Sequence, residues 1–178
     1  MTSIASSRHV ETSESPSTLL YPDLDAELKT TRRVLERVPD GNNDYRPHEK
    51  SMTIGSLASH LAQLPGFAIA MLTTEEFDVS NRPQTPAPAN TEERLKVFDQ
   101  VSGKLRELIQ QLTWDQARAT WTLKFRDRVA MQGPRSVMVR SAGITHMAHH
   151  RAQLGVYLRL LGIQVPGSYG LSADEPFA

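Results

Sequence analysis

Two histidines four residues apart are the feature of this sequence with the clearest chemical potential. They are His146 and His150, within a segment whose apolar residues recur at helical spacing. At about 100° per residue, this spacing places both imidazoles on one face of a helix, one turn apart. Two imidazoles so placed can bind one metal ion together. The same spacing also suits two histidines that are satisfied by hydrogen bonds, so further ligands must come from elsewhere in the chain.

A third histidine lies in the middle of another apolar stretch. His60 has Leu57, Leu61 and Leu64 as near neighbours on the helical pattern. Burying an unpaired imidazole is costly, so His60 needs a partner. That partner is either a hydrogen-bonding group on a neighbouring helix or a metal ion.

The composition limits the classes of function. The chain has 178 residues, enough for one domain, and its formal net charge is zero. We therefore expect neither nucleic acid nor a membrane as a partner. The absence of cysteine excludes disulfides, thiolate metal sites and cysteine nucleophiles. The sequence suggests no bilayer-spanning run and no signal segment, and we expect a cytoplasmic protein.

Apolar residues at three- and four-residue steps predict four long amphipathic helices. The predicted helices span residues 23–38, 53–74, 91–112 and 134–161. Residues 1–20, which are rich in Ser and Thr, are predicted to form a flexible tail. Residues 21–178 then form the domain, which ends in an extended C-terminal segment.

The helix ends carry recognisable signals. Thr53 or Ser51 can cap the second helix, and Asn90 with Glu93 resembles a capping box for the third. Pro65 is expected to kink the second helix.

The connections are unequal in length. Residues 81–90 contain three prolines and form a long crossover between the second and third helices. Residues 114–119 suit a short helix, and residues 120–131 suit two short strands or an extended excursion. The expected fold class is therefore all-α, a four-helix bundle with a long crossover and a short hairpin before the last helix. Since bundles build metal sites between facing helices, His60 can meet the other two histidines.

Several segments together resemble one known family. They are PHEKSMT at residues 47–53, LASHL at 57–61, HMAHHRAQLGVYLR at 146–159 and GIQVPGSYGLSADE at 162–175. In order and spacing they resemble the DinB/YfiT-like family over roughly residues 21–175. The resemblance implies a four-helix bundle, often a homodimer, with a divalent metal on His60, His146 and His150. Ala152 and Leu171 depart from the family pattern, and we expect them to change packing rather than metal binding.

Three neutral imidazoles leave an open coordination position, as in catalytic metal sites. Zinc is the first choice, and nickel, iron or manganese also accept imidazole. Such a metal could lower the pKa of bound water, or of a thiol, and so create a nucleophile. By resemblance, the chain is a metal-dependent hydrolase or a transferase that uses a low-molecular-weight thiol. No further catalytic residue is assigned.

Two alternatives stay open. The first is a non-catalytic metal-binding dimer, induced by stress or DNA damage, that acts through protein interactions. The second is a purely structural bundle whose histidines are satisfied by hydrogen bonds. A fourth side-chain ligand would indicate a closed site, whereas an open position facing a cavity would favour an enzyme.

The residues around the three histidines are predicted to have structural or supporting roles rather than to bind the metal. By helical phase, His149 lies on the helix surface, Gln153 can turn toward the same cavity, and Arg151 pairs with a carboxylate at an interface or rim. His48 is expected to anchor its loop through a hydrogen bond. Trp121 and Tyr157 are expected to pack in the core rather than to line the site.

Overall fold

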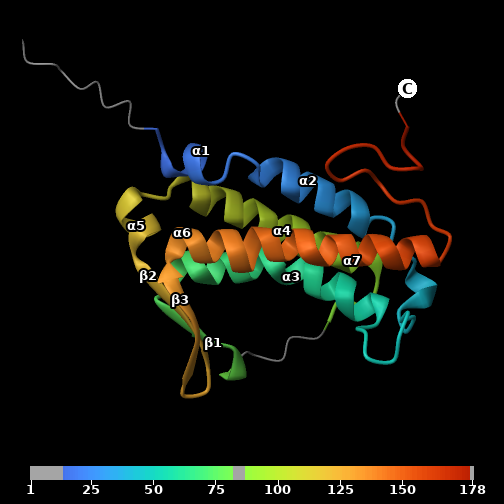
Figure 1. The fold of residues 1–178 in the computed structure, drawn as a ribbon, viewed down its shortest axis with the longest axis horizontal. Helices are drawn as coiled ribbons and strands as arrows, with labels where there is room; N and C mark the ends of the chain where they lie inside the picture. Colours follow the sequence, from blue (N-terminus) through green and yellow to red (C-terminus); the bar gives the residue numbers. More distant parts are fainter. Residues whose placement is uncertain (1–13, 82–86, 177–178) are drawn as a thin grey trace, which may run out of the picture.

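Four long helices form the body of the molecule in a computed structural model that describes residues 14–81 and 87–176. The first three are α2 (Leu24–Leu35), α3 (Ile54–Thr73) and α4 (Thr91–Gln110). The last runs through α6 (Arg135–Met138), a π-helical segment (Val139–Thr145) and α7 (His146–Leu160) without a break. Both α2 and α3 lie against α4 and against α7 (Figure 1), so the predicted four-helix bundle is confirmed.

The sequence signals at the helix starts act largely as expected. Thr53 Oγ1 accepts a hydrogen bond from Ser56 N at 3.2 Å and caps α3, which continues through Pro65. Asn90 Oδ1 accepts from Glu93 N at 2.8 Å and caps α4. The carboxylate of Glu93 accepts from Ala89 N rather than from Asn90 N, so the capping box is shifted by one residue.

One apolar core joins the four helices. It draws on every helix of the bundle, and its most deeply buried members include Leu28, Leu61, Phe98 and Leu154. Burial of these side chains, at about 1.5–3 kcal/mol each, is the main force that holds the helices together. A rigid bundle of this kind can fix side chains on facing helices at defined distances.

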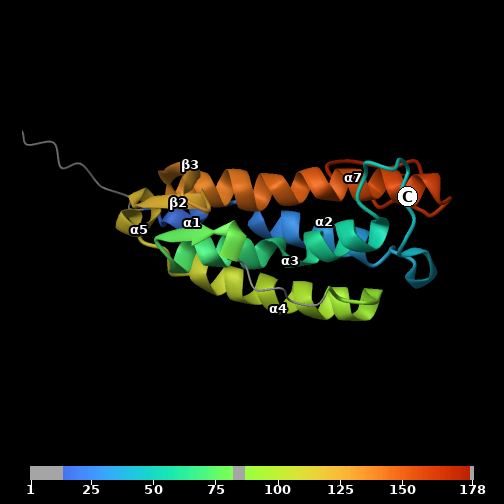
Figure 2. The same ribbon diagram turned by 90° about the horizontal axis from the view of Figure 1, so that it is seen from below.

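A small sheet at one end of the bundle corrects the all-α expectation. The short helix α5 (Trp114–Arg118) and the hairpin of β2 (Thr120–Phe125) and β3 (Arg128–Pro134) were anticipated. A further strand, β1 (Glu76–Asp78), follows α3 and pairs in parallel with β2. The result is a three-stranded mixed sheet in the order β1-β2-β3, and Figure 2 shows it at the same end of the bundle as α5.

The two ends of the chain contact the bundle differently. Residues 1–13 of the predicted flexible tail lie outside the described residues, and α1 (Pro16–Leu20) is a short helix that the sequence did not suggest. The C-terminal segment runs back over the bundle as an extended chain. Ion pairs hold it there, with Asp174 on Arg159 of α7 at 2.6 Å and Glu175 on Arg33 of α2 at 2.6 Å.

Helix α3 is the most apolar of the long helices in the described part of the chain. Its 20 residues, with a mean hydropathy of 1.2, meet the length and composition of a membrane-crossing helix, which corrects the expectation that the chain has no run of this kind. Of the most apolar window, 61% is buried inside the bundle. A central core helix passes the same test, so the position of α3 between α4 and α7 accounts for its composition.

The π-helical segment marks a close approach of two helices. Gly143 lies in this segment, and a Cβ added there would come within 3.1 Å of the Cβ of Ala68 on α3. Glycine therefore lets the last helix approach α3 directly before His146. Because π-helical turns change the phase of the residues that follow, this segment sets the direction in which α7 presents its histidines.

Candidate metal centre

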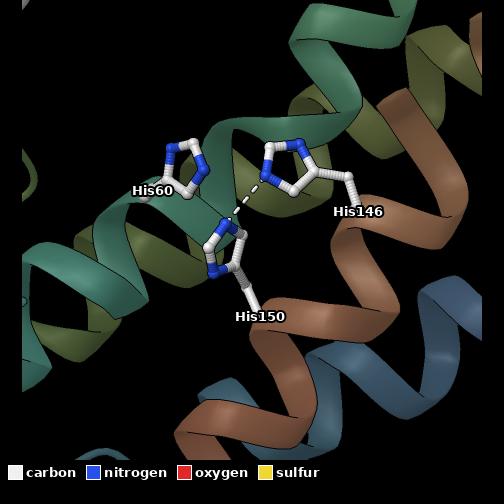
Figure 3. Close-up of side chains that lie close together, drawn as sticks. All are labelled: His60, His146 and His150. Atoms are coloured by element: carbon white, nitrogen blue, oxygen red, sulfur yellow. Dashed lines mark hydrogen bonds between the residues drawn. The ribbon is translucent and has the colours of Figure 1, made fainter. Parts of the chain in front are cut away.

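The three predicted histidines converge between α3 and α7. One ring nitrogen from each of His60, His146 and His150 lies within 4.8 Å of the other two. Figure 3 shows His60 approaching from α3 while the other two rings extend from successive turns of α7. All three side chains are half-buried. The structure thus brings together the residues that the sequence singled out.

Hydrogen bonds on the outer side fix how two of the rings are used. His146 Nδ1 lies 3.2 Å from the carbonyl oxygen of Ala142, which can only accept, so this nitrogen carries the proton. His150 Nδ1 lies 2.7 Å from Gln153 Oε1 and donates in the same way. Such partners set the tautomer and the ring direction of metal-binding histidines. The Nε2 atom of each ring is therefore left with a lone pair facing inward.

The two inward nitrogens lie unusually close for a pair of acceptors. His146 Nε2 and His150 Nε2 are 2.8 Å apart. Two lone pairs at this distance repel unless a cation, either a proton or a metal ion, lies with them. A tetrahedral metal at about 2.0–2.1 Å from each nitrogen would hold them about 3.3 Å apart, a small opening of the present geometry. The donor set and its geometry fit a divalent ion that accepts imidazole.

The surroundings keep one of these rings neutral. Burial lowers the pKa of His150 below its ordinary value, and the neighbouring His146 and His149 lower it further. The hydrogen bond to Gln153 acts in the opposite direction but does not outweigh them. A lowered pKa keeps the imidazole unprotonated at neutral pH, which is the form that binds a metal.

A cavity of about 570 Å³ adjoins the histidines. His60 and His146 belong to its lining, together with Gln63, one turn after His60 on α3. Most of the other lining side chains are aliphatic or aromatic and come from α3, α4 and the sheet. Among the described residues, no fourth His, Cys, Asp or Glu joins the three-histidine group. Two of the three histidines therefore line an open space.

Four of the neighbouring residues take the positions expected of them, whereas Gln153 is exposed and is not among the residues that line the cavity. His149 is exposed and stands outside the three-histidine group, although its ring contacts that of His150. His48 accepts a hydrogen bond from Lys50 N at 3.1 Å within its own exposed loop. Trp121 is fully buried, and Tyr157 is buried with its hydroxyl donating to Met52 O. Both aromatic residues are packing residues, as predicted.

Arg151 was only partly anticipated. It does pair with a carboxylate, but the pair is buried inside the bundle rather than at a rim. Arg151 Nη1 donates to Glu27 Oε2 at 2.7 Å and to Thr31 Oγ1 at 3.1 Å, both on α2. Tyr169 from the C-terminal segment lies over the guanidinium and donates to the same carboxylate.

Sequence reasoning missed several parts of the site. Gln63 lies three residues after His60, and helical phase alone could have placed it on the same face. The wall formed by Phe77 and Leu123 had no usable signal, because β1 is only three residues long. The carbonyl of Ala142 was not foreseen either, since its role depends on the π-helical segment.

Comparison with known proteins places the chain in a family. The model of the DinB family matches residues 11–176. No curated protein sequence matches the chain.

Three solved structures share the fold. A DinB-like protein from Bacillus cereus ATCC 10987 is 21% identical, with a TM-score of 0.65 over 84% of this chain and 95% of that one. A DinB-like protein from Bacillus subtilis is 18% identical, with a TM-score of 0.62 over 89% and 95% of the two chains. A DinB family protein from Exiguobacterium sibiricum 255-15 is 19% identical, with a TM-score of 0.61 over 90% and 97%. At these identities the similarity of the structures establishes the fold alone. The family assignment rests on the family model, which covers nearly the whole sequence. The chain belongs to the DinB family.

Proposed function

We propose that the protein is a metal-dependent enzyme that binds a divalent ion on His60, His146 and His150. Zinc suits three imidazoles best, and nickel, iron or manganese can use the same ligands. The observation that carries the proposal is the convergence of three ring nitrogens beside a cavity of about 570 Å³, which His60 and His146 line. A structural metal site is normally closed by a fourth protein ligand, whereas a catalytic site keeps one position open for water or substrate.

The chain's own groups prepare this site for chemistry. Ala142 O and Gln153 Oε1 hold two imidazoles with their lone pairs inward, so little rearrangement is needed on loading. The apolar cavity walls limit water near the site, which strengthens electrostatic interactions there. A bound divalent ion would supply Lewis acidity, lowering the pKa of water or of a thiol.

The reaction class we favour is hydrolysis or transfer with a low-molecular-weight thiol. Because the chain contains no cysteine, a nucleophilic sulfur has to arrive with a cosubstrate. The cavity beside the histidines offers room for a small molecule of this kind.

Metal content is the first test. Protein purified without chelator and without a nickel column should hold about one ion per chain, as expected for a single three-ligand site. His60→Ala should abolish this binding, whereas the matched variant His149→Ala should retain it, since His149 is exposed and outside the group. Wild-type protein that can be loaded with neither zinc nor nickel would refute the proposal.

Thiol binding is the second test. The cobalt-substituted protein should develop a thiolate-to-metal charge-transfer band when N-acetylcysteine is added. A site that binds cobalt but gives no such band with any small thiol would favour water as the nucleophile, and hence hydrolysis. Metal binding without turnover of ester, amide or thiol substrates would instead support a non-catalytic metal-binding protein.

A further inference from the structure

The chemistry of the cavity walls changes sharply with distance from the histidines. Along α3 the lining residues are His60, Gln63, Leu64, Gly66, Phe67 and Ala70 in that order. His60 and Ala70 are ten positions apart, which is about 15 Å along the helix axis at 1.5 Å per residue. Polar groups therefore lie at one end of this face and apolar groups over the rest.

Two residues of the sheet also line the apolar part of the cavity. Phe77 on β1 and Leu123 on β2 are direct partners in the parallel ladder, and both line the cavity. The rings of Phe67 and Phe77 stand edge to face, with their centroids 5.7 Å apart. The ring of Phe67 also packs against the buried Trp121, with the two ring centroids 6.0 Å apart, and this contact fixes the position of Phe67. Aromatic walls of this kind favour apolar alkyl or aryl groups.

Charge is missing from this cavity. Within the part of the chain that the structure describes, no Asp, Glu, Lys or Arg belongs to its lining. A ligand with several charges, such as a nucleotide, would lose its hydration here without gaining an ion pair. The cavity therefore selects for an uncharged body.

We infer that the substrate has an uncharged, apolar alkyl or aryl body and one terminal oxygen or sulfur head. The head lies at His60 and His146, and the body extends along α3 toward Ala70, against the side chains of Phe67 and Phe77. This inference rests on the proposed function for the role of the head, whereas the apolar body follows from the walls alone. A polar cosubstrate would have to enter from the histidine end.

A series of probes of increasing length tests the inference. Alkyl hydroxamates from acetohydroxamate to octanohydroxamate have one metal-binding head and a growing apolar tail. Calorimetric titration of the zinc-loaded protein should show affinity rising about fourfold per methylene, as expected for burial of a CH₂ group. Equal affinity across the series, with zinc bound, would overturn the inference and leave the metal site standing.

A variant at the far end locates the tail. Ala70→Leu adds volume where the apolar body ends, so octanohydroxamate should lose about tenfold in affinity while acetohydroxamate is unaffected. The matched control is Ala152→Leu, which makes the same change at an exposed position on α7. Parallel loss of both hydroxamates in Ala70→Leu, or loss in the control as well, would contradict the assigned direction.

A metal-independent probe separates the two proposals. The neutral dye N-phenyl-1-naphthylamine should bind the metal-free wild type with increased fluorescence and bind Ala70→Leu much more weakly. If zinc fails to bind but the dye behaves in this way, the metal proposal falls and the apolar site stands. If the dye is not bound by the metal-free wild type, the apolar site is refuted whatever the metal result.

Discussion

Helix α7 contributes to two polar clusters that differ in charge and in access to solvent. The histidine cluster is the three-histidine group, and the arginine cluster consists of Arg151, Glu27 and Thr31. His150 and Arg151 are consecutive residues of α7, so their side chains leave the helix about 100° apart. His150 turns to the other two histidines, next to the cavity. Arg151 turns to Glu27 and Thr31 on α2 and is sealed in the core. One turn of α7 therefore carries both half of a buried ion pair and part of the three-histidine group.

The difference between the clusters is one of charge balance and access. In the arginine cluster, the guanidinium and the carboxylate neutralise each other, with side chains only 1% and 9% exposed. Tyr169 covers the pair from the C-terminal segment. The histidine cluster has no anion among its members, keeps two lone pairs inward and is half-buried. The charges of the first cluster are balanced, although Arg151 Nη2 has no hydrogen-bond partner among the described residues, whereas the second cluster could hold a cation.

The largest effect is expected from breaking the arginine cluster. Glu27→Gln keeps the shape of the side chain but leaves the Arg151 charge buried and unpaired. The free energy of unfolding should fall by about 3–5 kcal/mol, measured by urea denaturation. The zinc content of the folded protein should not change, because the two clusters use different faces of α7.

Asp25→Asn provides the matched control for this loss. It removes one carboxylate charge from the same helix, but its ion pair with Arg106 is exposed and should cost only about 0–1 kcal/mol. Similar losses for the two variants would mean that the buried pair has no special role in stability.

The next effect concerns how the histidines are held. Gln153→Ala removes the acceptor that fixes the His150 tautomer, and zinc affinity should fall about 10–100-fold. Competition with a chromophoric chelator measures this change. Gln153→Glu should retain or increase affinity, since a carboxylate accepts the same hydrogen bond. Unchanged affinity in Gln153→Ala would show that the ring is oriented by packing alone.

The sequence was sufficient for the parts of the fold that depend on local pattern. Helical periodicity and caps such as Thr53 and Asn90 identified the four long helices. His146 and His150 were paired because residues four apart share a helix face, while the link from His60 to α7 came from the expected bundle geometry and from family resemblance. These features depend on a few neighbouring residues, so they can be recognised without knowing the rest of the molecule.

Features made by distant contacts could not be read in this way. β1 is three residues long and pairs with residues more than forty positions later, which leaves no periodic signal. Arg151 can be buried because Glu27, 124 residues earlier in the chain, accepts a hydrogen bond from its guanidinium. The cavity needs α3, α4 and the sheet together. The three histidines are recognisable from local sequence, whereas the space beside them exists only once these distant elements pack together.

The smallest change in stability is expected where Tyr169 of the C-terminal segment contacts the arginine cluster. Tyr169 is 77% exposed, and its hydroxyl donates to Glu27 Oε2 at 3.2 Å. Tyr169→Phe removes this bond and should cost less than about 1 kcal/mol in unfolding free energy.

The titration of Tyr169 tests the same contact more sharply. Burial raises its pKa above the usual value, with Arg151 acting in the opposite sense and the bond to Glu27 raising it again. A raised pKa means that this stabilisation is present below about pH 10, the unfolded value, and is lost as the pH rises through the folded one. In Glu27→Gln the acceptor charge is gone and the Arg151 charge is unbalanced, so the pKa of Tyr169 should fall. Ring resonances followed by NMR against pH will measure it; an unchanged pKa would mean that Tyr169 rests on the surface without closing the cluster.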